Sequence, residues 1–389
     1  MAAKRKARSL DDEPSASSPK KATKARSAKK STKREPKAKV PTAADYVRDL
    51  RAMSGVEEAD YAVMSDPLAW VSSVEEWLPT GSLAIDRLTG GGYPIGRIVE
   101  VAAWEGVGKS TMLDQSIAMA QSQGAVCVLI DSEQARDAKY TATLGVDMDS
   151  LIVHKASTIE DAFEGIDRVI ALQEANIAKL AKSKQKAPPM LIVWDSMGGT
   201  PTKAEQAGAA DDKHVASAAK AIKLNLKRMA ARIANARVAF VFANQFYQDI
   251  GPFASIKTYG GSGVRYYTSL RVWLSRKGAL KIGDRAVGHI IEAKLKKTRI
   301  NKPQPPAELG LIYGAGLHNA YTLFQWGKTS GVDSSHRWIQ SRGSWQWLML
   351  PDGTHEAFQH QYIGFAEVLQ NRPDVYEQMV TQYRAESSL

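Results

Sequence analysis

Short apolar runs alternate with amphipathic stretches between residues 97 and 244, and this alternation predicts strands followed by helices. The apolar runs predict strands at 97–101, 125–131, 151–155, 190–195 and 237–244. Apolar residues at helical spacing predict helices at 112–120, 158–180 and 216–236, and a polar helix is expected around 134–144. Strands that alternate with helices indicate an α/β fold with a mostly parallel, twisted sheet covered on both faces.

The pattern differs on either side of this region. Residues 43–54 predict a short amphipathic helix, with Tyr46, Val47, Leu50 and Met53 on one side. After about Gly316 the chain becomes a mixture of aromatic and polar residues, and a Pro-Asp-Gly turn is expected at 351–353. These changes divide the chain into a tail (1–40), an N-terminal helical segment (41–79), a core (80–318) and a small C-terminal α+β domain (319–389).

Charge is concentrated in the tail. The first 40 residues contain 14 of the 52 basic and four of the 41 acidic residues, whereas the other 349 residues have a net charge of only +1. No aromatic residue precedes Tyr46, so the tail cannot bury enough apolar area to offset its ordering entropy and is expected to be disordered. It is interpreted as a loose grip on nucleic acid, with a targeting signal and a solubilising extension as the alternatives.

Cysteine content and hydropathy bound the location of the protein. The single cysteine, Cys127, lies within an apolar run, so it is expected in the core, and disulfide scaffolds and cysteine zinc sites are excluded. No stretch approaches the ~20 apolar residues of a membrane span. The N-terminus has no apolar segment typical of a signal peptide. A reducing, cytoplasmic compartment is therefore expected.

A glycine-containing loop follows the first core strand and precedes a helix, which is the setting of phosphate-binding G-x-x-x-x-G-K-[S/T] loops. In such loops backbone N–H groups bind the anion, Lys109 adds a positive charge, and Ser110 offers its hydroxyl to Mg²⁺. Ala103 stands at the first glycine position, so a chance glycine-rich turn is the alternative. The predicted nucleotide-binding stretch comprises Trp104, Glu105, Gly106, Val107, Gly108, Lys109, Ser110 and Thr111.

Three other apolar runs end in polar side chains. Asp195 is placed to hold the shell of Mg²⁺, Glu133 to activate a water molecule, and Gln245 to contact a γ-phosphate. Ligands bind at the carboxyl ends of strands in open α/β sheets, so these residues are expected to meet there. The alternatives are a turn or cap residue for Asp195 and a solvated glutamate that opens a helix for Glu133.

Taken together, the chain from Thr80 to Gly316 resembles the RecA-type recombinases of bacteria and bacteriophages. The matching stretches are Gly81-Ser82-Leu83, Pro94-Ile95-Gly96-Arg97-Ile98-Val99-Glu100, Gly108-Lys109-Ser110-Thr111, Ile130-Asp131-Ser132-Glu133, Leu144-Gly145-Val146-Asp147, Asp195-Ser196, Lys203-Ala204-Glu205, Asn244-Gln245 and Ile312-Tyr313-Gly314-Ala315-Gly316. Their common order along the chain is far more specific than the phosphate loop alone.

The resemblance implies roles for individual residues. Tyr140 is expected to stack on adenine, and the pair Lys297 and Arg299 to reach the ATP of a neighbouring subunit. The first DNA-binding loop corresponds to about 205–215 and the second to about 246–261, while residues 41–79 correspond to a segment that docks on an adjacent subunit. The expected DNA-binding residues are Lys213, His214, Lys220, Phe246, Tyr247, Phe253, Lys257, Gly260, Gly261 and Arg265.

Departures from the family pattern accompany these matches. Besides Ala103, Gly106-Val107 replaces a serine pair, the acidic C-terminal tail is absent, and the basic N-terminal tail is extra. Phe246, Tyr247 and Phe253 make the second loop aromatic, which favours stacking on unpaired bases, with packing against the body as an equal alternative.

The function implied by the resemblance is that of an ATP- and Mg²⁺-dependent recombinase. It would form filaments on single-stranded DNA, pair them with homologous double-stranded DNA and exchange strands, near the nucleoid of a bacterial or phage-infected cell. Single-strand-binding or loader proteins are further partners that the resemblance implies. The alternatives are a hexameric helicase with the same core and a non-catalytic DNA-coating protein whose ATPase has decayed around Ala103.

Overall fold

The structure, a computed structural model, describes residues 41–53, 55, 61–63, 74–208, 212–248, 255–333 and 336–387. The predicted basic tail at 1–40 lies outside the described residues. The chain divides into two units, residues 1–69 and 70–389. In the first unit, helix α1 (Ala43–Arg51) begins at a capping box formed by Thr42 and Asp45, and this confirms the predicted helix. All other described helices and strands belong to the second unit.

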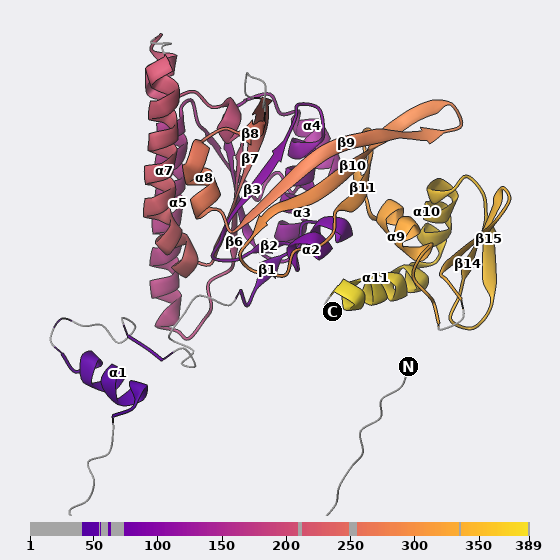
Figure 1. Cartoon of the computed structure of the whole chain (residues 1–389), viewed down its shortest axis with the longest axis horizontal. Coiled ribbons are helices and arrows are strands. Elements are labelled where there is room, and N and C mark those ends of the chain that lie inside the picture. Colours follow the sequence, from indigo (N-terminus) through magenta and orange to yellow (C-terminus); the bar gives the residue numbers. More distant parts are fainter. Residues whose placement is uncertain are drawn as a thin grey trace, which may run out of the picture. The chain divides into compact units, whose positions relative to one another are not determined.

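A large twisted sheet forms the centre of the second unit (Figure 1). Its strand order is β12-β11-β10-β9-β3-β7-β6-β4-β5. The strands are β3 (Ile98–Ala103), β4 (Val126–Asp131), β5 (Leu151–Lys155), β6 (Met190–Asp195), β7 (Val238–Gln248), β9 (Leu270–Ile282), β10 (Arg285–Thr298), β11 (Ala307–Ile312) and β12 (Gly316–His318). From β9 to β5 neighbouring strands are parallel, whereas β9 to β12 form an antiparallel extension.

Helices cover both faces of the parallel part. On one face α3 (Lys109–Ser122) packs through Leu113 and Ile117 against a cluster that includes Val101 and Val193. On the other face α5 (Ile159–Ala181) and α7 (Asp212–Asn235) pack against Ile192 and its neighbours. Continuous burial of β3 and β6 explains why their sequences are apolar throughout rather than alternating. The predicted α/β architecture is therefore confirmed.

Short elements complete the core. They are β1 (Trp77–Leu78), α2 (Leu83–Thr89), β2 (Tyr93–Pro94), α4 (Ala138–Thr143), η2 (Met197–Gly199), α6 (Lys203–Gln206), β8 (Ile256–Thr258) and α8 (Gly261–Tyr267). Buried Cys127 lies in β4, as expected for a core cysteine. In the described residues, no helix is long and apolar enough to span a membrane.

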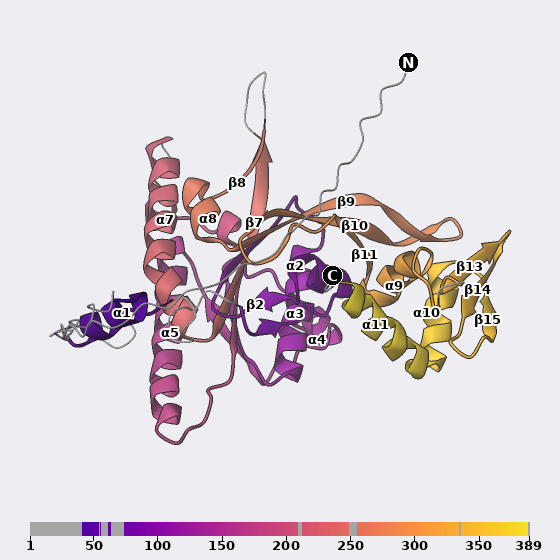
Figure 2. The same cartoon turned by 60° about the horizontal axis from the view of Figure 1, so that its bottom comes forward.

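The C-terminal residues form a small α+β lobe beside the antiparallel extension (Figure 2). It consists of α9 (Asn319–Gly327), β13 (Ile339–Arg342), β14 (Trp345–Met349), β15 (His355–Phe358), α10 (Tyr362–Asn371) and α11 (Pro373–Ser387). The expected turn at 351–353 joins β14 to β15, and the N–H of Gly353 donates to the carbonyl of Leu350. The apolar cluster of the lobe also includes Leu83 of α2 and Leu280 of β9, which attach the lobe to the core.

Two sequence expectations are wrong in detail. The helix predicted at 134–144 begins only at Ala138, because the Asp137 carboxylate accepts from the N–H groups of Lys139 and Tyr140 and caps the helix there. The second DNA-binding loop was expected to begin at about 246, but β7 continues to Gln248 and pairs there with β8. Cross-strand hydrogen bonds decide this extension, and a pattern of single residues does not reveal them.

Candidate functional site

The phosphate loop lies between the carboxyl end of β3 and the first turn of α3. Gly106 and Gly108 have φ angles of 71° and 107°, which side chains rarely adopt, and a Cβ on Gly108 would lie 2.4 Å from Leu311 Cδ1. Ala103 instead is the last residue of β3, fully buried and paired with both Gln245 and Leu274. Because Ala103 continues the strand, this position needs no glycine here.

A pocket of about 420 Å³ opens beside this loop. Its walls contain Glu105, Gly106, Gly108, Lys109, Ser110, Thr111, Glu133, Tyr140, Asp195, Gln245, His289, Leu311, Tyr313 and Gly314. The structure thus gathers in one place most of the residues predicted to bind nucleotide. Trp104 and Val107 are not part of the wall, because Val107 is buried and the exposed Trp104 ring packs on Phe246.

The antiparallel extension supplies four wall residues that sequence reasoning missed. Nε2 of His289, on β10, lies 3.0 Å from the carbonyl oxygen of Val107, which is hydrogen-bonding distance. His289 therefore supports the phosphate loop. Leu311 lies on β11, and Tyr313 and Gly314 follow it. The matched stretch 312–316 was the available signal for the last two, whereas no pattern in the sequence singles out His289.

Lys109 is directed back onto its own loop. Its ammonium donates to the carbonyl oxygens of Ala103 at 3.1 Å and Trp104 at 3.0 Å. Burial lowers the pKa of Lys109, while the negative charges of Asp195 and Glu133 act in the opposite direction. A lysine that is partly desolvated and surrounded by oxygens is suited to exchange these carbonyls for phosphate oxygens.

Carboxylates and an amide lie at the ends of three adjoining strands. Asp195 ends β6, Glu133 follows β4, and Gln245 lies in β7 opposite Ala103. The Ser196 hydroxyl donates to Glu133 Oε1 and orients this carboxylate. A Cβ on Gly199 would lie 3.0 Å from Glu133 Oε1 and 3.6 Å from Gln245 Nε2, so these side chains flank the same glycine. The predicted meeting of strand ends is therefore present.

Arg136 is a charged residue near this site that sequence reasoning missed. It precedes α4, its Nη2 donates to Asp195 Oδ2 at 2.6 Å, and its Nη1 forms an ion pair with Asp114 of α3. Asp114 Oδ2 also accepts from the hydroxyl of Thr141 at 3.0 Å. Burial lowers the pKa of Arg136, and the charge of Asp195 opposes that shift. Arg136 lies in a polar stretch that predicted only a solvated helix. Nothing in the sequence indicated that it would meet Asp114 and Asp195.

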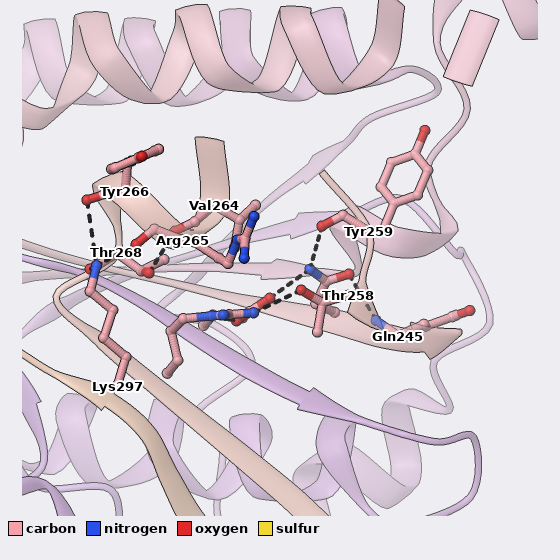
Figure 3. A network of polar contacts seen from close by, with 11 residues as sticks. Gln245, Thr258, Tyr259, Val264, Arg265, Tyr266, Thr268 and Lys297 are labelled. Carbon is pink, nitrogen blue, oxygen red and sulfur yellow. Dashed lines mark hydrogen bonds and ion pairs between the residues drawn. The ribbon is translucent and has the colours of Figure 1, made fainter. Parts of the chain in front are cut away.

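The root of the second loop is anchored by a buried polar network, shown in Figure 3. Asn244 Nδ2 donates to Glu100 Oε1 at 2.8 Å and to the carbonyl of Tyr259 at 2.9 Å. Arg271 forms an ion pair with Glu100 and donates to the hydroxyl of Thr258 at 2.9 Å. Residues on both sides of the second loop are thereby attached to β3 and β9.

Aromatic residues at this root lie on opposite faces of β7. Phe246 is 9 % exposed and packs between Trp104 and Trp273, with ring centroids 5.7 and 4.8 Å away. Tyr247, the next residue, is 44 % exposed, because successive side chains of a strand point to opposite faces. Of these two aromatic residues, Phe246 therefore packs against the body of the protein, whereas the exposed Tyr247 is free to meet a base.

A hollow of about 300 Å³ lies next to Tyr247. Its lining residues are Tyr247, Ile256, Lys257, Thr258, Gly261, Arg265, Arg271, Trp273 and Lys296. Lys296 Nζ lies 4.6 Å from the centre of the Trp273 ring. Gly260 caps α8 with a φ of 87°, where a Cβ would lie 2.7 Å from Val264 Cγ2. This side of the molecule therefore combines exposed basic and aromatic groups.

Other predicted DNA contacts are only partly described. Lys220 is exposed on α7. Lys213 and His214 belong to α7, but their side chains lie outside the described residues, as does Phe253. The expected first loop, 205–215, begins in α6 and passes through 209–211, which also lie outside the described residues.

Lys297 and Arg299 lie away from the pocket of their own chain. The ammonium of Lys297 donates to the carbonyls of Arg265, Tyr266 and Thr268 (Figure 3). Burial, together with the positive charges of Arg299 and Arg271, lowers the pKa of Lys297 to about 8. Arg299 borders a separate hollow of about 540 Å³ that also contains Arg97 and Tyr266. Neither residue lines the nucleotide pocket.

The donor set of the pocket fits a nucleoside triphosphate with Mg²⁺. In the described part of the chain no group of three or more acidic, histidine or cysteine side chains could hold a metal by itself. A cation at this pocket must therefore take most of its oxygens from phosphate, water and Ser110, with Asp195 nearby. Mg²⁺ keeps several waters and binds in this way, through one or two carboxylates and substrate phosphates.

A strand, a glycine loop and a helix, with a carboxylate ending a nearby parallel strand, define the class of P-loop nucleotide-binding proteins. Residues 62–318 match the family model of the RecA N-terminal domain. RecA of Thermotoga neapolitana is 32% identical over 307 residues, which cover 78% of this chain and 82% of that protein. RecA of Thermotoga maritima is 31% identical over 317 residues, 81% of this chain and 83% of that protein. The chain belongs to the RecA family of recombinases, which confirms the resemblance.

Proposed function

We propose that this protein is an ATP-dependent recombinase that forms filaments on single-stranded DNA and catalyses homologous pairing and strand exchange. The observation that carries the proposal is the position of Gln245. It lines the nucleotide pocket and lies in the strand that leads directly into the second loop. One short element therefore connects the proposed ATP site with the proposed DNA site.

In ATP hydrolysis each pocket residue has a distinct part. Lys109 binds phosphate oxygens, and Ser110 and Asp195 would hold Mg²⁺, the latter through water. Bound Mg²⁺ supplies charge neutralisation for the phosphates. Glu133, oriented by Ser196, positions the attacking water and accepts its proton. Tyr140, whose hydroxyl lies 3.3 Å from that of Thr111, stacks on the adenine.

Coupling to DNA depends on the amide of Gln245. A hydrogen bond from this amide to the γ-phosphate exists only with ATP bound, so it biases the position of β7 and of the loop that follows. The anchors at Asn244 and Thr258 fix both sides of the loop root. The signal would reach DNA through the paired strands β7 and β8, where Tyr247 and Lys257 are exposed.

A neighbouring subunit completes the site. Lys297 and Arg299, which do not line their own pocket, reach the γ-phosphate of the next subunit, and a forked guanidinium is suited to that contact. The segment 41–79 docks on the adjacent subunit through the apolar side of α1. Self-association and ATP binding then support each other.

DNA is held by basic and aromatic groups along the two loops. Lys213, His214 and Lys220 contact phosphates beside the first loop, and Lys257 and Arg265 do so beside the second, with Tyr247 and Phe253 stacking on bases. The basic tail adds affinity that falls with salt. The protein acts in the cytoplasm, with single-strand-binding or loader proteins as further partners.

Electron microscopy with ATP, with and without single-stranded DNA, tests this function. Helical filaments that require both ligands, together with strand exchange, are expected. Closed rings would indicate a hexameric helicase instead. Phosphate release no higher than that of a Lys109→Ala variant would indicate a DNA-coating protein without ATPase activity.

A further inference from the structure

Arg136 joins two carboxylates that come from different elements beside the nucleotide pocket. Its side chain is only 13% exposed, and those of Asp114 and Asp195 are 4% and 5% exposed. One guanidinium therefore faces two nearly buried negative charges. Such a group is held firmly, because a buried charge without a partner is costly and a planar guanidinium can serve two acceptors at once.

The three members of this group surround the proposed phosphate site. Asp114 lies on α3, the helix that begins at Lys109, and Asp195 ends β6. Arg136 comes from the loop between β4 and α4, and Thr141 of α4 donates to Asp114. The guanidinium thus links the phosphate-loop helix to the strand that carries the acidic pocket residue.

The hydrogen bond from Arg136 engages only one of the two carboxylate oxygens of Asp195. Arg136 Nη2 donates to Oδ2 of Asp195 at 2.6 Å, and Asp195 also lines the pocket. Arg136 is not among the residues of the pocket wall, so it acts on the pocket through Asp195 rather than by touching a ligand.

We propose that Arg136 is a positioning residue for the magnesium site: it fixes the Asp195 carboxylate so that its second oxygen faces the cation beside Ser110. The inference rests on the proposed Mg²⁺-dependent binding of ATP. Partners that orient a carboxylate near a metal commonly account for 10- to 100-fold in metal affinity. Loss of Arg136 is therefore expected to affect Mg²⁺ dependence more than nucleotide binding itself.

The experiment measures binding of a fluorescent ATP analogue to the full chain at increasing Mg²⁺ and in EDTA. The main variant combines Arg136→Met with Asp114→Asn, which removes one charge of each sign. We expect the Mg²⁺ midpoint to rise about tenfold or more, with affinity in EDTA unchanged. The matched control is Arg232→Met, since Arg232 also bridges two carboxylates, Asp167 and Glu174, but lies between α5 and α7.

An unchanged Mg²⁺ midpoint in a folded double variant would overturn the inference. Equal losses of affinity with and without Mg²⁺ would overturn it as well, because they would indicate direct contact with the nucleotide or a distorted pocket. If the double variant does not fold, the Mg²⁺ midpoint is measured on Arg136→Lys instead. A lysine keeps the charge but lacks the forked guanidinium that serves both carboxylates. A raised midpoint supports the inference, and a wild-type midpoint overturns it. Wild-type protein that binds no nucleotide would instead contradict the proposed function.

Discussion

Two largely buried arginines lie in the two regions of the proposed mechanism, the second loop and the nucleotide pocket, and their partners differ. Arg271, beside the second loop, faces a single carboxylate, Glu100, and neutral groups complete the network. Arg136, beside the nucleotide pocket, faces two carboxylates, Asp114 and Asp195. Among the ion-paired groups alone, the first network is balanced in charge, whereas the second has one more carboxylate than guanidinium and lies near Lys109.

This difference separates an anchor from a ligand site. A balanced, fully hydrogen-bonded network needs nothing further and holds the backbone around it in place. Asp195, by contrast, lines the nucleotide pocket and has one oxygen bound to Arg136, so its carboxylate can still interact with a cation. The second loop is thus predicted to depend on its anchor for stability, and the nucleotide pocket on its carboxylates for chemistry.

The largest effect is expected from the pocket. Glu133→Gln should lower ATP turnover by about 10²- to 10⁴-fold, because a positioned general base contributes about that much. The amide keeps an oxygen that accepts from Ser196. Phosphate release with single-stranded DNA measures the loss, while ATP and DNA binding should stay near wild type. Loss of ATP binding would instead make Glu133 a structural residue.

Substitution of the anchor residue Arg271 should lower the stability of the protein and leave ATP turnover per folded molecule unchanged. Arg271→Met leaves Glu100, which is 0% exposed, buried without its ion partner, so the free energy of unfolding should fall by about 3–5 kcal/mol. Urea unfolding measures this change. The matched variant with Arg271→Met and Glu100→Gln removes both charges, so its free energy of unfolding should fall clearly less. Equal losses in the two variants would contradict the interpretation of a charge-balanced anchor.

Coupling between the two regions should depend on Gln245. Gln245→Ala should reduce the factor by which a non-hydrolysable ATP analogue tightens single-stranded DNA binding, a factor typically of about 5 to 150 for coupled sites. Fluorescence anisotropy with and without the analogue measures it. Gln248→Ala, at the exposed end of the same strand, is the control and should keep the coupling. Full coupling in Gln245→Ala would mean that the signal travels by another route.

The smallest effect concerns pH and the predicted contact between subunits. With a pKa of about 8, Lys297 is charged in only about a tenth of molecules at pH 9. Filament assembly with ATP should therefore weaken above pH 8, and Lys297→Arg should remove this dependence. Light scattering from pH 7 to 9.5 measures it. An identical pH profile for both proteins would argue against the contact.

The folding stability of the chain should change with pH in the opposite direction to filament assembly. The folded pKa of Lys297 lies below the ordinary value of 10.5, so the unfolded chain binds more protons between these two values. The contribution of this lysine to stability therefore rises with pH across that window. Weaker assembly above pH 8 without lower stability would separate the loss of a subunit contact from unfolding.

Local patterns in the sequence were sufficient for much of the fold. The runs at 125–131 and 190–195 were recognised as strands because buried parallel strands are apolar throughout. The phosphate loop was recognised because its glycines, Lys109 and Ser110 lie together in the short stretch 106–110. Where the outcome depended on a distant partner, the patterns were insufficient. The pairing of β7 with β8 was missed for this reason. The start of α4 was placed too early for a local reason, because the cap formed by Asp137 was overlooked.

The sequence by itself determined which chemical groups end the strands: a lysine and a serine after β3, a glutamate after β4, an aspartate at the end of β6 and an amide in β7. Tertiary structure decided what surrounds them. His289 reaches the phosphate loop because β10 and β11 extend the sheet, and Phe246 turns inward between two tryptophans. Arg136 meets Asp114 and Asp195 because β4 and β6 are neighbours and α3 packs across them. Buried charges find their partners only when the chain folds, since those partners lie far apart along it.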